Sequence, residues 1–479
     1  MEIHLSDVSI DTLFLPIPVD KIEETISQSP LSPEDKDIVR RNAQAQLKAE
    51  CFDAALTLNC GSLIIALIKA NEKRPLFPWR NVCGTLFDIL KKYRIASLAV
   101  DATLISPEQC AALTDGLLLS EYSYNKDNSE KAVQHSLSFL NASEEQQLLI
   151  ERSRIQAEAA NKARFIADSP ANLMTPEILA AEAQKLAEGT DLKLTVLDEA
   201  EMKKLGFGAL LSVSQGSVHE ARLICLEHHH PEAQKTIAMV GKGLTFDAGG
   251  VSLKPAKGMN EMKYDKSGGA AVLNAMKAVS ELNPKINVIG VIPASENVTG
   301  ANAVKPGDVV KAYNGKTVEI INTDAEGRLI LCDALAWTVD KFKPDAIVNI
   351  ATLTGAVIRS LGRGIAAVAG NADDLCQNLV KAGSEVDERL WQMPICDVHE
   401  ELLKSDFADL ANVDDSGEAS LINGSVFLQH FVGDTPWAAI DIGGTAWRHR
   451  GADYIKGIGA SGFGCRLLSQ WALNESVQQ

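Results

Sequence analysis

The stretch TIAMVGKGLTFDAGG, residues 236–250, decides the fold of the larger part of the chain. Its first six residues, Thr236–Gly241, are apolar at nearly every position, as is typical of a strand buried on both faces of a parallel sheet. Lys242 and Asp247 follow, among glycines that let the backbone bend closely around a bound group. A phosphate loop is disfavoured, because the spacing matches neither GxxxxGK[ST] nor GxGxxG and an aspartate would repel a phosphate.

Further apolar runs alternate with helical stretches on the carboxyl side of this segment. The clearest helix is predicted over residues 267–282, where Val272, Met276 and Val279 share one face and Asn283-Pro284 ends the pattern. This alternation predicts a mainly parallel central sheet flanked by helices, in which ligands bind beyond the carboxyl ends of the strands. The other predicted strands are Ile286–Ile292, Thr317–Asn322, Ala346–Ala351 and Trp437–Gly443.

The amino-terminal part predicts a second, smaller α/β domain, because short apolar runs alternate with helical patterns there too. A long helical pattern begins at Glu144 and ends at Asp168-Ser169-Pro170, which marks a domain junction. A chain of 479 residues also exceeds a single ordinary core. We therefore expect an N-terminal α/β domain at residues 1–160 and a larger domain at 161–479. The predicted N-terminal strands are Leu13–Ile17, Ala54–Cys60, Ser62–Ile68 and Ala96–Ala102.

Charge and composition argue against two classes of partner. The formal net charge is −17, from 46 basic and 63 acidic side chains, and it disfavours binding to nucleic acids and anionic membranes. The amino terminus lacks the pattern of a signal peptide, and no apolar stretch is long enough to span a bilayer. Nine scattered cysteines without a CxxC pair indicate reduced thiols. We expect a cytoplasmic protein with no membrane partner.

Three carboxylates in two later motifs are candidate metal ligands. In MKYDKSGGA, Asp265 directly precedes the predicted helix, so a helix N-terminal carboxylate is the alternative interpretation. In NTDAEGRL, Asp324 and Glu326 are two residues apart, and in extended backbone they would project to the same side. A divalent cation would remove their mutual repulsion, whereas the alternative is ion pairing with Arg328 and surface lysines.

Together the three motifs predict a site for two divalent ions. Carboxylate oxygens suit hard or borderline ions such as Mg²⁺, Mn²⁺ and Zn²⁺, and four carboxylates plus one amine can satisfy two of them. None of the nine histidines lies in these motifs, so HExxH-type zinc chemistry is unsupported. The predicted ligands are Lys242, Asp247, Asp265, Asp324 and Glu326.

The segments GKGLTFDAGG, MKYDKSGGA and NTDAEGRL together resemble the leucyl aminopeptidase family, the cytosol aminopeptidases of the M17 class. The likeness continues through ATLTGA (351–356), FADLAN (407–412) and DIGGTAW (441–447). It implies a metal-dependent aminopeptidase that releases N-terminal amino acids from peptides by two-metal hydrolysis, with a leucine-like preference. It also implies two Mn²⁺ or Zn²⁺ ions per chain, a catalytic domain at 161–479 and assembly into a homohexamer.

The resemblance also assigns roles to residues outside the metal shell. Lys254 would stabilise the developing oxyanion, and Arg328 would hold a bicarbonate that serves as general base. The Leu353 carbonyl would accept a hydrogen bond from the substrate. Ordinary core packing remains the alternative for the residues that would line the pocket for the first side chain, Met262, Thr352, Gly355 and Ala460.

Three departures from the family pattern leave every proposed ligand intact. Ala248 replaces a serine, Ala439 stands where histidine is frequent, and DDSGEASLING (Asp414–Gly424) replaces a glycine-rich stretch. They bear on substrate preference and rate. Two other functions are disfavoured. The net charge argues against a homologue with an additional or replacement DNA-binding regulatory role, and the presence of all five ligands argues against an inactive homologue.

Overall fold

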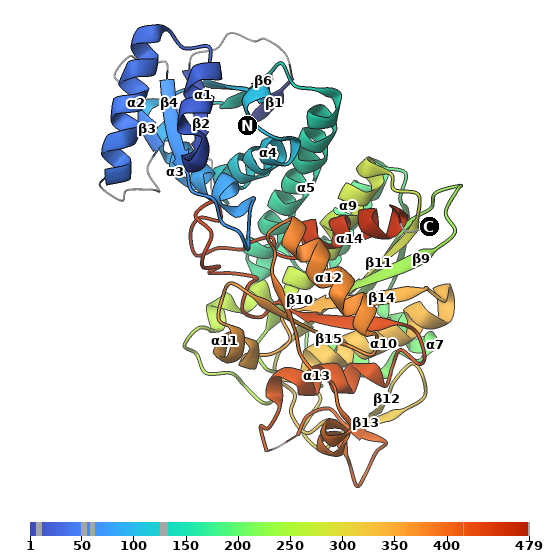
Figure 1. The fold of residues 1–479 in the computed structure, drawn as a ribbon. Helices are drawn as coiled ribbons and strands as arrows, with labels where there is room; N and C mark the ends of the chain where they lie inside the picture. Colours follow the sequence, from blue (N-terminus) through green and yellow to red (C-terminus); the bar gives the residue numbers. More distant parts are fainter. Residues whose placement is uncertain (6–11, 49–54, 58–62, 125–132, 415, 478–479) are drawn as a thin grey trace. The chain divides into compact units, whose positions relative to one another are not determined.

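The computed structural model describes residues 1–5, 12–48, 55–57, 63–124, 133–414 and 416–477 (Figure 1). They form two compact units, one made of Met1–Glu158 with Gly451–Gly457 and the other of Ala159–Arg450 with Ile458–Gln479. Helix α5 (Glu144–Asp168) carries the chain from the first unit into the second. Within the ranges given, no helix is long and apolar enough to cross a membrane.

The first unit is built on a six-stranded sheet in the order β1-β6-β5-β2-β4-β3. Every neighbouring pair in it is parallel except β3 with β4. The strands are β1 (Glu2–His4), β2 (Thr12–Pro18), β3 (Ala55–Thr57), β4 (Leu63–Ile68), β5 (Ser97–Asp101) and β6 (Ser136–Leu140). The helices are η1 (Val19–Lys21), α1 (Ile22–Gln28), α2 (Pro33–Lys48), α3 (Phe77–Tyr93), η2 (Ala102–Leu104) and α4 (Pro107–Glu121).

Strand β4 shows why this sheet is covered on both faces. All six of its residues are buried, and they alternate between two apolar clusters. Ile64 and Ala66 pack with residues of α3 and α4, whereas Ile65 and Leu67 pack with residues of α1 and α2. A strand that is apolar at consecutive positions therefore lies in the middle of a three-layer α/β unit.

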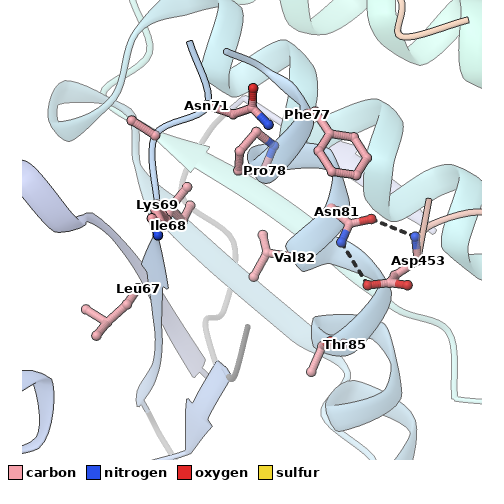
Figure 2. Close-up of a pocket in the computed structure, with 11 residues that line it drawn as sticks. Leu67, Ile68, Lys69, Asn71, Phe77, Pro78, Asn81, Val82, Thr85 and Asp453 are labelled. Carbon is pink, nitrogen blue, oxygen red and sulfur yellow. Dashed lines mark hydrogen bonds between the residues drawn. The ribbon is translucent and has the colours of Figure 1, made fainter. Parts of the chain in front are cut away.

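The segment Gly451–Gly457 belongs to the first unit although it lies far along the chain. Asn81 of α3 donates from Nδ2 to Asp453 Oδ2 at 2.8 Å, and its Oδ1 accepts from the backbone N of Asp453 at 2.6 Å (Figure 2). Lys456 forms an ion pair with Asp88 of the same helix. Hydrogen bonds from both polar atoms of the Asn81 amide hold this segment on α3.

The second unit contains a nine-stranded sheet in the order β16-β15-β18-β14-β9-β11-β8-β7, with β10 paired to β11. Five of its pairings are parallel, and the pairs β11–β8, β7–β8 and β15–β18 are antiparallel. The strands are β7 (Lys193–Leu197), β8 (Arg222–His228), β9 (Thr236–Gly241), β10 (Gly243–Asp247), β11 (Asn287–Asn297), β14 (Ala346–Ala351), β15 (Ala366–Gly370), β16 (Leu390–Gln392) and β18 (Trp437–Asp441). A separate three-stranded sheet contains β12 (Val309–Lys311), β13 (Thr317–Glu319) and β17 (Leu410–Ala411).

Helices cover both faces of the nine-stranded sheet, as Figure 1 shows for α9 and α14 on one side and α10 and α13 on the other. Both α9 and α10 pack on β9 and β11. Ala238 and Val240 of β9 share a buried cluster with Leu331 of α10. The helices are η3 (Ala171–Leu173), α6 (Pro176–Glu188), α7 (Glu199–Leu205), α8 (Gly208–Ser214), η4 (Met259–Lys266), α9 (Ser267–Leu282), α10 (Glu326–Phe342), α11 (Ala356–Leu361), α12 (Asp373–Glu385), η5 (Asp397–Leu403), α13 (Ser420–Gln429) and α14 (Cys465–Val477).

The predicted fold class is confirmed, with two adjustments to individual elements. The predicted strand Thr317–Asn322 is too long, because β13 ends at Glu319 and a turn follows. The predicted strand Ile286–Ile292 is too short, because β11 continues to Asn297, where its polar end pairs with β10. Of the predicted strand Ala54–Cys60, only residues 55–57 lie within the described ranges.

Candidate metal centre

Lys242 lies in the single-residue break between β9 and β10. Strand β9 pairs with both β14 and β11, whereas β10 pairs only with β11. The Lys242 backbone N donates to Ile350 O at 3.0 Å, and its carbonyl accepts from Gly269 N at the start of α9. The side chain is 3% exposed. The sequence therefore places this lysine inside the unit, at the edge where β14 and β9 end.

Three buried carboxylates meet beside this lysine. One oxygen each from Asp247, Asp265 and Glu326 lies within 4.8 Å of the others. Asp247 ends β10, Asp265 lies in η4, and Glu326 is the first residue of α10. Lys242 Nζ lies 2.9 Å from Asp265 Oδ2 and donates to Glu326 Oε1 at 2.8 Å. The three motifs of the sequence thus converge on one point at the strand ends.

Neighbouring groups hold the carboxylates in place. Asp247 Oδ1 accepts from Asn297 Nδ2 and from Gly249 N, both at 2.9 Å. Gly249 has a φ of +87°, and a Cβ at this position would lie 2.8 Å from Asp324 Oδ1. Asp265 Oδ1 accepts from Thr352 Oγ1 at 2.6 Å. Because Asp265 is anchored through Thr352 and the N-cap residue of α9 is Lys266, the helix-capping alternative for Asp265 is wrong.

Asp324 occupies a different place from the one that its spacing suggested. Residues 323–325 form a turn and Glu326 begins α10, so the two carboxylates do not alternate along extended backbone. Asp324 is the most exposed of the four acids, at 34%, and pairs with Lys254 Nζ, which also lies 2.7 Å from Asp247 Oδ2. The prediction from strand geometry is therefore wrong, because a helix N-terminus replaces the strand.

The electrostatics of the cluster favour a bound cation. Burial raises the pKa of Asp247, Asp265 and Glu326, and mutual repulsion between these carboxylates adds to it. Burial disfavours the charge of Lys242, but the nearby carboxylates outweigh this effect and raise the pKa of the lysine. The buried Glu326 Oε2 has no hydrogen-bond partner, and Asp265 Oδ2 has only the ion pair to Lys242, without hydrogen-bonding geometry. Oxygen donors and an unpartnered carboxylate oxygen fit a divalent ion, and Lys242 would join them as the neutral amine if the ion displaced its proton.

Arg328 lies two residues beyond Glu326 in α10 and is 5% exposed. Its Nη1 donates to Asn412 O at 2.8 Å and to Asn423 Oδ1 at 2.6 Å, and its Nε has no partner. No carboxylate of the described residues lies within ion-pair distance of it, so pairing with Glu326 is excluded as its role. Burial lowers its pKa to about 10, which leaves it cationic at neutral pH.

The predicted pocket residues lie on several elements. Thr352 lies against the cluster, since its carbonyl accepts from Lys242 Nζ at 3.0 Å. Met262 is half-buried in η4, three residues before Asp265. Leu353 follows Thr352, and Gly355 is the N-cap residue of α11. Ala460 forms an isolated antiparallel β-bridge with Trp447. The Trp447 ring stacks on Tyr264 of η4, with 5.5 Å between the ring centroids.

Several residues at the site carried no recognised sequence signal. Asn297 follows the predicted end of its strand, and Asn423 lies in the segment Asp414–Gly424, which the sequence marked only as a departure; residue 415 of that segment lies outside the described ranges. Asp441 lies in the quoted motif DIGGTAW without a predicted role, although its carboxylate accepts from Leu353 N and Thr354 Oγ1. A polar residue at the end of an apolar run was the signal available for Asn297 and Asp441, whereas Asn423 lies inside α13 and had no such signal.

The comparisons with known proteins agree with this geometry. Residues 161–469 match the model of the cytosol aminopeptidase family, catalytic domain. A probable cytosol aminopeptidase of Desulfotalea psychrophila is 43% identical over 375 residues, covering 76% of this chain and 74% of the relative. One from Cenarchaeum symbiosum is 40% identical over 397 residues, covering 81% of each. The solved bottromycin maturation enzyme BotP in complex with Mn is 26% identical, with a TM-score of 0.85, covering 98% of this chain and 100% of that one.

The parallel sheet and the buried lysine–carboxylate cluster at its strand ends define a metallo-exopeptidase of the leucyl aminopeptidase type. The chain belongs to the cytosol aminopeptidase family, whose model matches residues 161–469. The family and the enzyme class predicted from the sequence are thereby confirmed.

Proposed function

We propose that this chain removes N-terminal residues from peptides by two-metal hydrolysis, with the ions held by Lys242, Asp247, Asp265, Asp324 and Glu326. The observation that carries the proposal is the meeting of three buried carboxylates within 4.8 Å, one of them with an unpartnered oxygen. Lys242 and Lys254 offset only two of the four negative charges that this group has together with Asp324, so a divalent cation would stabilise it further. Asp324 extends the donor set toward solvent, where the more exchangeable ion would bind.

The donor set supports Mn²⁺ or Zn²⁺ as the ions. Carboxylate oxygens with a single amine suit hard and borderline cations, and the similar enzyme BotP has been solved in complex with Mn. When bound, such ions polarise the scissile carbonyl and activate water for attack. The exchange of one ion for another should change the rate, because these ions differ in Lewis acidity.

Lys254 and Arg328 both supply positive charge, Lys254 from a partly exposed side chain and Arg328 from a buried one. Lys254 is 21% exposed and reaches the cluster with its ammonium, so it can stabilise negative charge on the carbonyl oxygen of a bound substrate. Arg328 is a buried cation with an unpartnered Nε, which favours a small anion such as bicarbonate beside it. That anion would accept the proton of the attacking water.

The finer properties of the enzyme follow from the same proposal. Met262, Thr352, Gly355 and Ala460 would line the pocket for the first side chain, which favours a leucine-like residue, and the Leu353 carbonyl would accept from the substrate. The catalytic domain would be residues 161–479, apart from the segment Gly451–Gly457 of the first unit, and would follow an α/β domain at 1–160. By its family we also propose a homohexamer that acts in the cytoplasm on peptides.

A pair of matched variants tests the metal site. Glu326→Gln should lower metal content and peptidase activity together, because it removes a charge from the cluster. Glu388→Gln is the control, since Glu388 is also a buried carboxylate, 4% exposed, which accepts from Gly464 N at 2.8 Å. Metal content is measured by mass spectrometry and activity with leucine amide. Equal metal content in both variants, or full activity of chelated wild-type protein, would overturn the proposal.

A further inference from the structure

Asp441 ends β18 and holds the turn that follows β14. Its Oδ1 accepts from Leu353 N at 3.1 Å and from Gly443 N at 2.9 Å, and its Oδ2 accepts from Thr354 Oγ1 at 2.7 Å. The side chain is 4% exposed. Strands β14 and β18 run parallel with Ala351 opposite Asp441, so the acid lies beside the point where the turn leaves the sheet. The register of β18 against β14 thus places the Asp441 carboxylate next to residues 352–354.

The peptide unit between Thr352 and Leu353 connects Asp441 to the candidate metal ligands. Its N–H donates to Asp441, and its carbonyl, on the opposite side of the planar trans peptide, accepts from Lys242 Nζ at 3.0 Å. The hydroxyl of Thr352 donates to Asp265 Oδ1 at 2.6 Å. One residue therefore touches two of the proposed ligands, and the orientation of its peptide plane depends on Asp441.

Removal of this carboxylate would leave buried donors without acceptors. The N–H groups of Leu353 and Gly443 would lose their partner, and an unsatisfied buried donor costs about 1–3 kcal/mol. The turn would have to rotate to recover hydrogen bonds, and Thr352 would then move away from Lys242 and Asp265. The groups around a metal ligand commonly set metal affinity in this manner.

We propose that Asp441 is a positioning residue of the metal centre, which acts through the Thr352–Leu353 peptide to orient Lys242 and Asp265. The inference rests on the metal site proposed above. Asp441 is not one of the proposed metal ligands and would not contact an ion. Its removal should nevertheless weaken metal binding.

The test compares Asp441→Ala with Asp441→Asn. Both backbone donors bond the same oxygen, so an asparagine amide oxygen can accept from both, while Thr354 Oγ1 accepts from the new amide nitrogen. We expect Asp441→Ala to weaken binding of Mn²⁺ or Zn²⁺ by about 10- to 100-fold. Asp441→Asn should stay within about threefold of wild type, because its hydrogen bonds are retained. Affinity is measured by competition with a chelator at pH 8, alongside kcat and KM.

Asp333→Ala is the control for a purely structural loss. Asp333 is likewise fully buried and accepts from two backbone donors, Leu210 N at 2.9 Å and Tyr313 N at 2.7 Å. The substitution Asp333→Ala should lower the melting temperature and leave the metal affinity of the folded protein unchanged. Wild-type metal affinity in folded Asp441→Ala, or an equal loss in Asp333→Ala, would overturn the role of Asp441.

Thr354→Val provides a second route if Asp441→Ala does not fold. It retains the acid and removes the contact to Oδ2, together with the hydrogen bond that Thr354 Oγ1 accepts from Val357 N at 3.2 Å, so metal affinity should fall by about fivefold. Unchanged affinity in this variant would then overturn the proposal. Failure of the metal site itself is distinguishable, because wild-type protein would bind no ion tightly or would retain activity after chelation.

Discussion

The substitution Gly327→Ala should weaken metal binding and leave the fold intact. Gly327 is the second residue of α10, and a Cβ there would lie 2.6 Å from Lys242 Nζ, 2.8 Å from Cε and 3.0 Å from Cδ. Ordinary contacts need about 3.5–4.0 Å, so the lysine end must move by roughly 1 Å. Metal–ligand distances are held within about 0.2 Å, so such a displacement is incompatible with coordination by this amine.

The effect on stability should be small by comparison. Overpacking of a core costs about 1–3 kcal/mol, and alanine in place of glycine in a helix returns about 1 kcal/mol, which leaves a net loss of about 0–2 kcal/mol. We expect metal affinity to fall at least about tenfold, as for loss of a ligand or its support. The assay is metal stoichiometry by mass spectrometry after dialysis against a metal buffer, with thermal unfolding of the metal-free protein in parallel.

Gly189→Ala is the matched control for this variant. Gly189 caps α6 with a φ of −97°, and the nearest atom to an added Cβ is Leu186 O at 3.8 Å, so a methyl group fits there. Metal binding should be unchanged in this variant. Wild-type metal affinity in Gly327→Ala would refute the reasoning, since it would show that the Lys242 amine can move without consequence for the ions.

Three further predictions concern charge and substrate. Lys242→Arg should lose metal more completely than Lys242→Met in mass spectrometry after equal dialysis, because a guanidinium keeps its proton next to the ions; two retained ions in the arginine variant would remove Lys242 from the ligand set. Burial raises the pKa of Asp333 to about 7, although hydrogen bonds from Leu210 and Tyr313 oppose it. The folded state therefore holds this proton more tightly than the unfolded state, so the free energy of unfolding should fall between about pH 4 and pH 7, by up to about 1.4 kcal/mol per unit. Denaturant titrations at pH 5 and pH 8 should show a steeper fall in wild type than in Asp333→Asn, because other buried carboxylates such as Asp247 titrate in both proteins, and an equal fall in both would contradict the prediction. A peptide with an acetylated amino terminus should not be cleaved, since its nitrogen no longer offers a lone pair; release of fragments in chromatography would point to an endopeptidase.

Local sequence patterns predicted the elements that are apolar throughout. The runs Thr236–Gly241 and Ala346–Ala351 coincide with β9 and β14, because strands buried on both faces need apolar side chains at nearly every position. The helix Ser267–Leu282 was equally predictable, since Asn283 ends it in the left-handed region, with a φ of +45°. In contrast, the polar end of β11 could not be recognised, because Asn297 is buried by its pairing with β10 and not by its own polarity.

The same distinction applies to the site. The three motifs predicted a group of carboxylates, since motifs that follow the carboxyl ends of parallel strands come together at one edge of the sheet. Spacing could not reveal that Glu326 begins a helix or that Asp324 pairs with Lys254. The support from Asp441 depends on the register of β14 and β18, although β14 ends at Ala351 and β18 begins only at Trp437. Contacts of this kind come from tertiary structure and leave no local pattern.

The segment Gly451–Gly457 has a consequence for how this protein can be cut or recombined. The chain passes between the two units at residues 158–159, 450–451 and 457–458, so neither unit is one continuous stretch. A protease that nicks α5 would leave the amino-terminal fragment attached through the contacts of Asn81 and Asp88 with this segment. Exchange of the amino-terminal unit between relatives would likewise have to transfer the seven residues Gly451–Gly457, which lie far along the chain from Glu158. We therefore expect that recombination between relatives exchanges both units together and not the first unit alone.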